Sequence, residues 1–213
     1  MGIKLNLKNV RIGWVNVFEK AADQTVDGQL KKGKYQLTAY LDKNDPQINK
    51  LDAAVLEALT EPKRGIGSVA AAEKWVDRNY GFGKHADKCA VRDLAERDKP
   101  IEGMEEGLYF KATSQKRPVI MTSAGERQTE RGLTIDGDDI EGKEVYAGCY
   151  ANISVEVYWY DQYKTLLVNL LGVRFREDGE AFGGAGETAT DDDLGDDDEK
   201  PQRKQRRSYN DEE

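Results

Sequence analysis

Chemically reactive side chains are scarce in this sequence of 213 residues. It holds two cysteines, Cys89 and Cys149, and a single histidine, His85. Two thiols are too few for a disulfide framework, and together with His85 they do not form a recognised zinc-binding spacing. One histidine leaves little material for a Ser/His/Asp or Cys/His arrangement, and the HExxH, GxSxG and P-loop motifs are missing. We therefore expect no metal, no cofactor and no enzymatic activity.

Long apolar runs are missing as well. No stretch approaches the roughly 20 apolar residues of a membrane-spanning helix, and the N-terminus lacks a signal-peptide pattern. Because no apolar run is long enough to span a bilayer, we expect no contact with a membrane. Two thiols without a secretory signal are typical of a reducing, intracellular setting. Cys149 opens an apolar strand face, where a small core residue is expected.

Negative charge is concentrated at the C-terminus. Residues 187–213 contain eleven acidic and five basic residues, so they carry −6 of the chain's net charge of −8. The acidic block at 187–199 has almost no apolar side chain and cannot offset its ordering entropy by burial. We expect one folded domain at 1–186 and a disordered tail at 187–213, acidic first and then of mixed charge. Such a polyanionic tail is a candidate competitor for a cationic groove in the domain.

A two-residue alternation of apolar and polar side chains dominates the domain. In the first strand the apolar parity changes near Lys8-Asn9, which predicts a β-bulge. Residues 19–33 are polar and read as a loop, and residues 123–144 are mostly polar. The predicted strands are 4–18, 34–41, 108–112, 118–122, 149–160 and 165–176.

A helical pattern interrupts the strands between the second and the third main strand. Asp45 suits a helix N-cap and Pro46 the first helical position, with apolar residues following at helical spacing. A second helix is predicted at 69–76. About five bent antiparallel strands are too few for a sandwich, so the pattern predicts a mainly β, five-stranded barrel with a helical insertion at about 45–88.

Binding chemistry is better represented than catalytic chemistry. Single-stranded nucleic acid is held by aromatic rings that stack on bases, about 1–3 kcal/mol each, and by Lys and Arg side chains along the phosphates. Four segments of the sequence interleave these two residue types. The candidate DNA-binding residues are Lys31, Lys32, Lys34, Tyr80, Phe82, Lys84, Tyr109, Lys111, Lys116, Arg117, Tyr158 and Tyr160.

Side-chain parity separates the aromatic residues of the strands. Tyr158 and Tyr160 fall on the polar parity, so we expect both on the surface. Trp159 falls on the apolar parity and is expected in the core. For Trp14 and Phe110 the same argument leaves core and surface open.

The order of these elements resembles that of bacteriophage-encoded single-stranded DNA-binding proteins with an OB fold and an acidic C-terminal tail. The resemblance covers residues 4–186. It rests on Lys34–Leu41 followed by Asp45-Pro46 and an amphipathic helix, on Leu108–Ala112, on Tyr146–Ile153 before the long hairpin, and on Leu170–Gly184 before the tail.

The resemblance implies an OB barrel that binds and protects single-stranded DNA during phage replication or recombination, with little sequence preference, in the cytoplasm of the bacterial host. It also implies that the acidic tail competes for the DNA groove and recruits replication proteins. Related tails usually finish in acidic residues capped by an apolar one. Here a basic run at 200–207 follows the acidic block instead, which departs from that pattern.

Two other functions stay open on the residues alone. One is an acidic interaction protein that mimics DNA, which predicts no oligonucleotide binding by the tailless domain. The other is a metal-dependent nuclease using Asp136, Asp138 and Asp139, which predicts Mg²⁺-dependent cleavage of single strands. The sequence carries no signal for a homo-oligomer.

Overall fold

The computed structural model describes residues 2–26, 28–79, 88–97, 101 and 104–182. Residues 1–182 form one unit of the chain. The predicted site residues Tyr80, Phe82 and Lys84 lie outside the described residues, as does the predicted tail at 187–213, so those predictions stay predictions.

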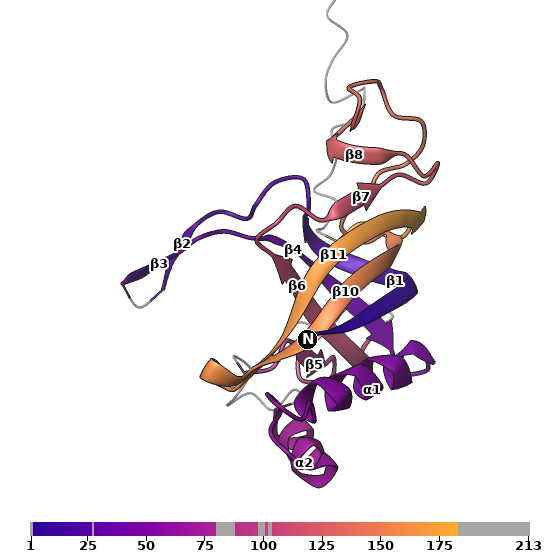
Figure 1. Cartoon of the computed structure of the whole chain (residues 1–213). Helices are drawn as coiled ribbons and strands as arrows, with labels where there is room; N and C mark the ends of the chain where they lie inside the picture. Colours follow the sequence, from indigo (N-terminus) through magenta and orange to yellow (C-terminus); the bar gives the residue numbers. More distant parts are fainter. Residues whose placement is uncertain (1, 27, 80–87, 98–100, 102–103, 183–213) are drawn as a thin grey trace, which may run out of the picture. The chain divides into compact units, whose positions relative to one another are not determined.

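Five long strands close into a barrel (Figure 1). They are β1 (Ile3–Asn16), β4 (Tyr35–Asp42), β6 (Gly107–Ser114), β10 (Tyr150–Tyr160) and β11 (Thr165–Glu177). Antiparallel pairing joins β6, β4, β1, β10 and β11 in that order, and β6 then pairs with β11 in parallel. This is the OB barrel that we predicted, with one correction to the expected all-antiparallel pairing. An odd number of strands cannot alternate in direction all the way round a closed barrel, so one pair must be parallel.

Two irregularities bend β1. Its register with β10 shifts between Leu7 and Val10, and Asn9 there has a φ of 51°. This confirms the predicted bulge. A second shift interrupts the pairing with β4 after Gly13, where Trp14 has a φ of 49°. Bulges increase strand twist, which lets one strand pair first with β10 and then with β4.

Short strands add to the barrel; the one predicted at 118–122 is present, and others fall in segments that we expected to be a loop or mostly polar. In 19–33, β2 (Gln24–Val26) pairs with β3 (Gln29–Lys31), and we call this hairpin the β2–β3 arm. No apolar–polar alternation marks this segment, because the arm has little apolar surface to bury. Further short strands are β5 (Val91–Asp93) beside β6, β7 (Val119–Met121) beside β11, and β8 (Arg127–Glu130) with β9 (Leu133–Thr134) beyond β7.

The predicted helical insertion lies between β4 and β6 in the chain. It comprises α1 (Gln47–Leu59) and α2 (Val69–Asn79). Asp45 Oδ1 accepts a hydrogen bond from the backbone N–H of Gln47 at 2.8 Å, which satisfies one donor of the first turn. α1 buries Leu51, Val55 and Leu59 against β1 and β10. No helix of the described residues is long and apolar enough to span a bilayer.

Burial in the barrel settles whether Phe110 and Trp159 are core or surface residues. Phe110 is fully buried, and Trp159 is only 6% exposed, as expected. The Trp159 ring meets Trp75 of α2 edge-on at 5.2 Å between centroids. Cys149 is a buried core residue, and burial raises the pKa of the Cys89 thiol to about 12, which leaves that thiol unreactive at neutral pH.

Candidate nucleic-acid interface

The outer surface of β4 and β6 gathers aromatic, polar and basic side chains around one hollow of about 520 Å³. Cross-strand pairing places Thr38 opposite Lys111, and Gln36 opposite Thr113. Gln24 of the β2–β3 arm lines the same hollow. We call this surface the β4–β6 face. It comprises Trp14, Gln36, Thr38, Arg92, Arg97, Tyr109, Lys111 and Thr113.

Flat π systems lie at one end of the β4–β6 face. The Tyr109 ring is stacked on the Tyr40 ring of the neighbouring strand, with 6.3 Å between centroids and 28° between planes. The Arg97 guanidinium carbon lies 5.6 Å from each centroid, and its Nη1 donates to Tyr40 Oη at 3.3 Å. This arrangement orders the rings and places a cation beside them, which combines the two devices used to hold single strands.

Lys111 lies beside two other cations. Partial burial lowers the pKa of its ammonium group, and the charges of Lys34 and Arg92 lower it further. Lys34 and Arg92 therefore lie close enough to Lys111 for their like charges to act on it. A phosphate placed there would relieve the repulsion.

Trp14 is the functional candidate that sequence reasoning left undecided. Its side chain is 69% exposed, although a smooth alternation from Ile12 would bury it. The second bulge of β1 turns it outward, and its left-handed backbone costs about 1–2 kcal/mol for a residue with a Cβ. A strained, exposed tryptophan beside a hollow is typical of a functional position. The second phase slip becomes visible only once the pairing with β4 is known.

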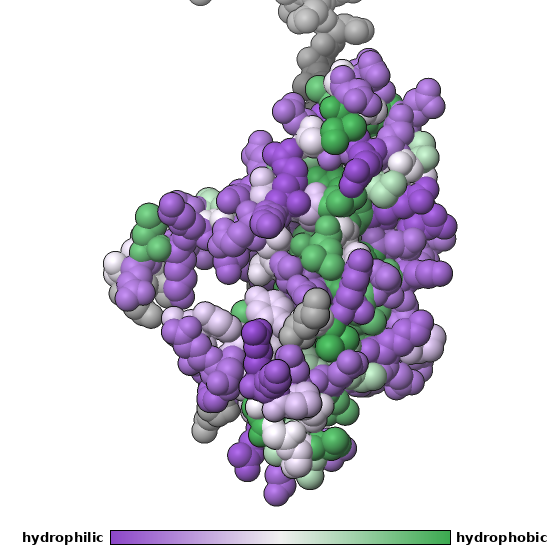
Figure 2. Space-filling model, in the orientation of Figure 1, coloured by the Kyte–Doolittle hydropathy of each residue, from purple (hydrophilic) through white to green (hydrophobic). Residues whose placement is uncertain are grey.

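The β2–β3 arm projects from the barrel on the same side as the tip of the β10–β11 hairpin (Figure 1). Lys31 and Lys32 are both exposed on the arm. Figure 2 shows that the arm stands clear of the body and that the surface around the intervening recess is mainly hydrophilic. The two predicted lysines are therefore accessible, but they lie on the arm and not on the barrel surface.

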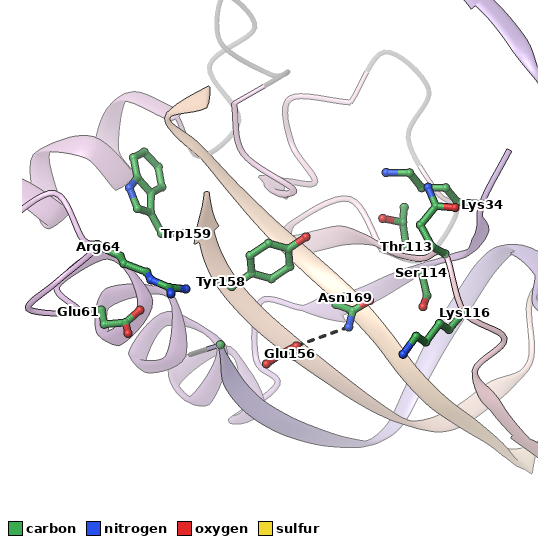
Figure 3. A pocket seen from close by; sticks show the side chains of 12 residues that line it. Lys34, Glu61, Arg64, Thr113, Ser114, Lys116, Glu156, Tyr158, Trp159 and Asn169 are labelled. Atoms are coloured by element: carbon green, nitrogen blue, oxygen red, sulfur yellow. Dashed lines mark hydrogen bonds between the residues drawn. The ribbon is translucent and has the colours of Figure 1, made fainter. Parts of the chain in front are cut away.

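A second hollow of about 460 Å³ collects three of the predicted residues, Lys34, Lys116 and Tyr158 (Figure 3). Thr113 lines both this hollow and the β4–β6 face. Tyr158 was expected on the surface but is half-buried, and burial raises the pKa of its hydroxyl group. Tyr158 does lie on the polar face of its strand, as predicted. Arg64, in the segment after α1, lines the same hollow.

Tyr160 lies apart from both hollows, at the tip of the β10–β11 hairpin. It is 41% exposed, and its ring centroid is 5.2 Å from that of Tyr163 in the 3₁₀ turn η1 (Asp161–Tyr163). Lys164 closes the turn with a left-handed φ of 51° and pairs with Asp161 at 2.5 Å. The hydrogen bond to Lys164 lowers the pKa of the Asp161 carboxyl group. Two accessible rings thus stand at this tip.

Arg117, also predicted, belongs to neither hollow described so far. Its guanidinium carbon lies 5.8 Å from the centroid of Tyr35, the first residue of β4. The structure therefore brings Tyr109 and Lys111 together on one face, and Lys34, Lys116 and Tyr158 in the adjacent hollow. It separates the arm lysines, Tyr160 and Arg117 from them.

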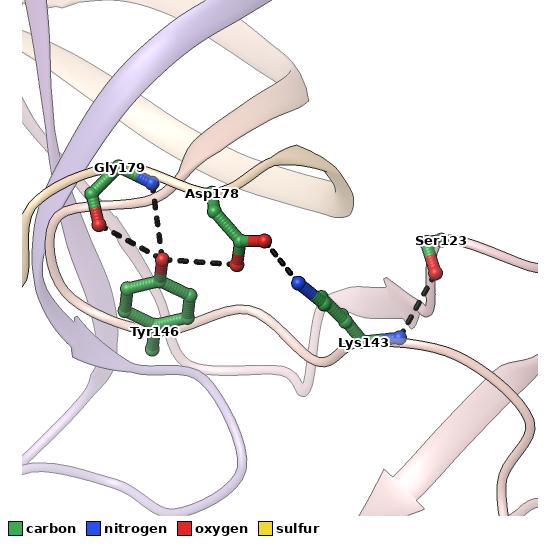
Figure 4. A network of polar contacts seen from close by, with 5 residues as sticks. All are labelled: Ser123, Lys143, Tyr146, Asp178 and Gly179. Carbon is green, nitrogen blue, oxygen red and sulfur yellow. Dashed lines mark hydrogen bonds and ion pairs between the residues drawn. The ribbon is translucent and has the colours of Figure 1, made fainter.

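A polar network fixes the chain after β11 (Figure 4). Tyr146 Oη accepts from the backbone N–H of Gly179 at 3.0 Å and lies 2.9 Å from the Gly179 carbonyl oxygen. Asp178 pairs with Lys143, and this hydrogen bond lowers the pKa of the Asp178 carboxyl group. The backbone N–H of Lys143 donates to Ser123 Oγ at 2.9 Å. We call residues 178–182 the C-terminal strap.

The strap runs back towards β1. Arg11 Nη2 donates to the Glu180 carbonyl oxygen at 3.1 Å, and the Phe182 N–H donates to the Ala147 carbonyl oxygen at 3.0 Å. Gly148 has a φ of 107°, and a Cβ there would lie 2.0 Å from the Glu180 carbonyl oxygen. The strap therefore requires glycine at this crossing, and it delivers Phe182 to the outer surface of the barrel.

Within the described part of the chain, no three His, Cys, Asp or Glu side chains are grouped so as to hold a metal ion. Asp136, Asp138 and Asp139 lie in the segment after β9, away from the β4–β6 face as its lining is defined.

Comparison with known proteins agrees with this architecture. A family model described as the single-stranded DNA-binding protein of Enterobacter phage Enc34 matches residues 3–202. The chain is 30% identical over 190 residues to a protein named p50 of Acyrthosiphon pisum secondary endosymbiont phage 1, covering 86% of this chain and 89% of that protein.

Two solved structures share the fold. The single-stranded DNA-binding protein from bacteriophage Enc34 in complex with ssDNA has a TM-score of 0.61 at 21% identity, over 84% of this chain and 89% of that one. The same phage protein in a second structure gives 0.59 at 19% identity, over 89% of each chain. With the family model matching nearly its whole length, the chain belongs to the Enc34 family of single-stranded DNA-binding proteins.

Proposed function

We propose that the protein binds single-stranded DNA, largely without regard to sequence, through base stacking and phosphate contacts on the β4–β6 face. The observation that carries the proposal is the Tyr40–Tyr109 stack beside the cation cluster of Lys111, Lys34 and Arg92. Every base has a face that can stack, so rings and cations together bind strands of any sequence. Membership of the Enc34 family, one of whose solved structures holds ssDNA, supports the same function.

The residues divide into two proposed roles. Trp14 and Tyr109 stack on bases across the β4–β6 face, and Tyr158 and Tyr160 extend stacking along the β10–β11 hairpin. The lysine and arginine side chains of the proposed interface hold phosphates. These are Lys31, Lys32, Lys34, Arg92, Lys111, Lys116 and Arg117. Tyr80, Phe82 and Lys84 keep the roles proposed from the sequence alone.

Binding without catalysis suits a protein that covers and protects single strands during phage DNA replication or recombination in the cytoplasm of a bacterial host. The acidic segment at 187–199 would compete with DNA for the cationic face and recruit replication proteins. Membership of a family described by a phage single-stranded DNA-binding protein supports the strand-binding part of this role.

The test is a titration of a labelled oligonucleotide with the whole chain and with a chain ending at Gly186, each at two salt concentrations. We expect saturable binding whose log–log salt slope is about −0.7 per phosphate neutralised. No binding by the shortened chain would instead favour a DNA mimic. Loss of the oligonucleotide only when Mg²⁺ is added would favour a nuclease.

A further inference from the structure

A third hollow, of about 650 Å³, lies beyond the barrel, where the end of β1 meets β8. Residues 15–19 form one wall, Arg117 in the β6–β7 connection forms another, and residues 129–131 form the third. None of these three walls belongs to the β4–β6 face, and the third is supplied by β8 and the residue after it.

Aromatic rings hold the cations of this hollow in place. The Arg131 guanidinium carbon lies 4.5 Å from the centroid of Phe18. Arg117 and Lys20 approach the ring of Tyr35 at 5.8 and 5.7 Å. Arg117 also donates a hydrogen bond to the Thr129 carbonyl oxygen, which links the β6–β7 connection to β8. Stacking on a ring orders a guanidinium group while leaving its N–H edge free to bind an anion.

The lining carries two cations and two carboxylates, so its formal charge is zero, and the question is whether the arginines are paired. Glu19 and Glu130 line it together with Arg117 and Arg131. In the described ranges, however, neither arginine forms an ion pair with a carboxylate, since the described ion pairs are all elsewhere. Rings and a carbonyl oxygen position these cations, so their charges are not neutralised by a bound acid. Arginine in this state matches the bidentate geometry of a phosphate group.

One hydrogen-bonded pair separates this hollow from the β4–β6 face. Gln36 lines the face, Asn16 lines the third hollow, and Gln36 Nε2 donates to Asn16 Oδ1 at 3.3 Å. Along β1 the two linings are consecutive, because Trp14 belongs to the face and Val15 to the hollow. A DNA strand stacked on Trp14 can therefore continue into the third hollow, whose lining begins at the next residue of β1.

We propose that the third hollow is a second phosphate-binding site, in which Arg117 and Arg131, supported by Lys20, hold the DNA backbone of nucleotides leaving the β4–β6 face. This inference rests on the proposed function and extends it, because it assigns a DNA-binding role to the β7–β8–β9 extension. The ligand is the phosphodiester backbone, so base identity has no influence at this site.

The experiment uses the whole chain and homothymidine oligonucleotides of about 4 to about 16 nucleotides, the range of site sizes of OB folds. Arg131→Gln is the main variant, because Arg117 also supports β8 through Thr129. Arg127→Gln is the matched control, since Arg127 is an exposed arginine of β8 that does not line the hollow. Lys20→Gln, a change at another exposed side chain, gives a second test of the same site.

We expect Arg131→Gln to leave the affinity for the shortest binding oligonucleotides unchanged and to lower the affinity for the longer ones. On the longer ones the log–log salt slope should become shallower by about 0.7, the value for one lost phosphate contact. Equal weakening at every length, or the same effect from Arg127→Gln, would overturn the second site. Failure of the unaltered chain to bind any length would instead refute the proposed function itself. A thermal unfolding curve for each variant separates loss of binding from loss of fold, and Lys20→Gln decides the matter if Arg131→Gln unfolds.

Discussion

Phe182 meets Tyr40 edge-on, with 5.5 Å between ring centroids and 73° between planes. The Arg11 guanidinium carbon lies 4.4 Å from the Phe182 centroid. Tyr40 is buried and is also stacked on Tyr109, so Phe182 packs on the same ring that supports Tyr109 of the proposed DNA-binding surface. Gly183 follows in sequence, so the acidic segment is covalently attached at the edge of this surface.

Removing the acidic segment should tighten DNA binding. A chain ending at Gly186 loses a segment of net charge −6, so DNA no longer competes with an internal polyanion. Fluorescence anisotropy of a labelled oligonucleotide at low salt measures the change, and the gain should shrink as salt is raised. A full-length chain with its acids at 187–199 changed to Asn and Gln controls for tail length. Unchanged affinity in both variants would contradict tail competition.

Trp14→Ala should weaken DNA binding by about 1–3 kcal/mol, the range measured for loss of one stacking aromatic residue. The thermal stability should barely change, because the side chain is exposed. Trp14→Phe should retain much of the affinity, since a smaller ring still stacks.

Tryptophan fluorescence provides an independent readout for Trp14. The chain has three tryptophans, and Trp75 and Trp159 contact one another on the barrel's helical side. We expect DNA to quench the emission of the unaltered chain more strongly than that of Trp14→Phe, because Trp159 also lines the second hollow but is buried. Full quenching in Trp14→Phe would place the DNA elsewhere.

As pH is raised, affinity for DNA should begin to fall at a lower pH than it would if Lys111 had the usual pKa of a lysine. The folded-state pKa of Lys111 lies below its usual value of 10.5, so its charge is lost at a lower pH in the free protein. A bound phosphate favours the charged form, and DNA binding therefore takes up a proton in this pH range. Lys111→Arg keeps its charge throughout and should remove the early fall, as salt-matched titrations from neutral pH upward will show. An identical pH profile in both proteins would exclude Lys111 from the interface.

The same shift has the opposite effect on folding. Between the lowered pKa and 10.5 the unfolded chain binds more protons at Lys111 than the folded one, so the contribution of this residue to stability rises with pH across that window.

Gly148→Ala should destabilise the fold much more than Gly132→Ala. Both glycines have a left-handed φ, so alanine adds backbone strain of about 1–2 kcal/mol at either position. At Gly148 the new Cβ also meets the backbone of the strap, whereas nothing lies within 4 Å of a Cβ at Gly132. Chemical denaturation of the two variants measures the difference. Equal losses would mean that the strap moves aside at no cost.

Much of the barrel could be predicted because its strands are long and their inner faces are apolar. The alternation in 149–160 and the parity change near Asn9 were enough to place a strand and a bulge. The β2–β3 arm gave no such signal, since residues such as Gln24, Gln29 and Lys31 bury nothing on the barrel. Backbone hydrogen bonds with a Gly28 turn hold it instead.

The candidate site was less predictable than the fold. Tyr109 and Lys111, which the structure places on one face, were predicted because aromatic–basic interleaving is a local property of the sequence. Trp14 was left undecided because the bulge that exposes it depends on pairing with β4, a long-range contact. Similarly, Tyr158 has the surface parity but is half-buried in a hollow that the segment after α1 also lines, and nothing near Tyr158 in the sequence indicates that hollow.

Photo-crosslinking tests the central claim most directly. The whole chain would be irradiated with a bromouracil-substituted single strand, and the attached peptides identified by mass spectrometry. The account predicts crosslinks to Trp14 and Tyr109 on the β4–β6 face, lost in excess unlabelled DNA. Crosslinks confined to α1, α2 or the segment 135–144, with none on β1, β4 or β6, would contradict it.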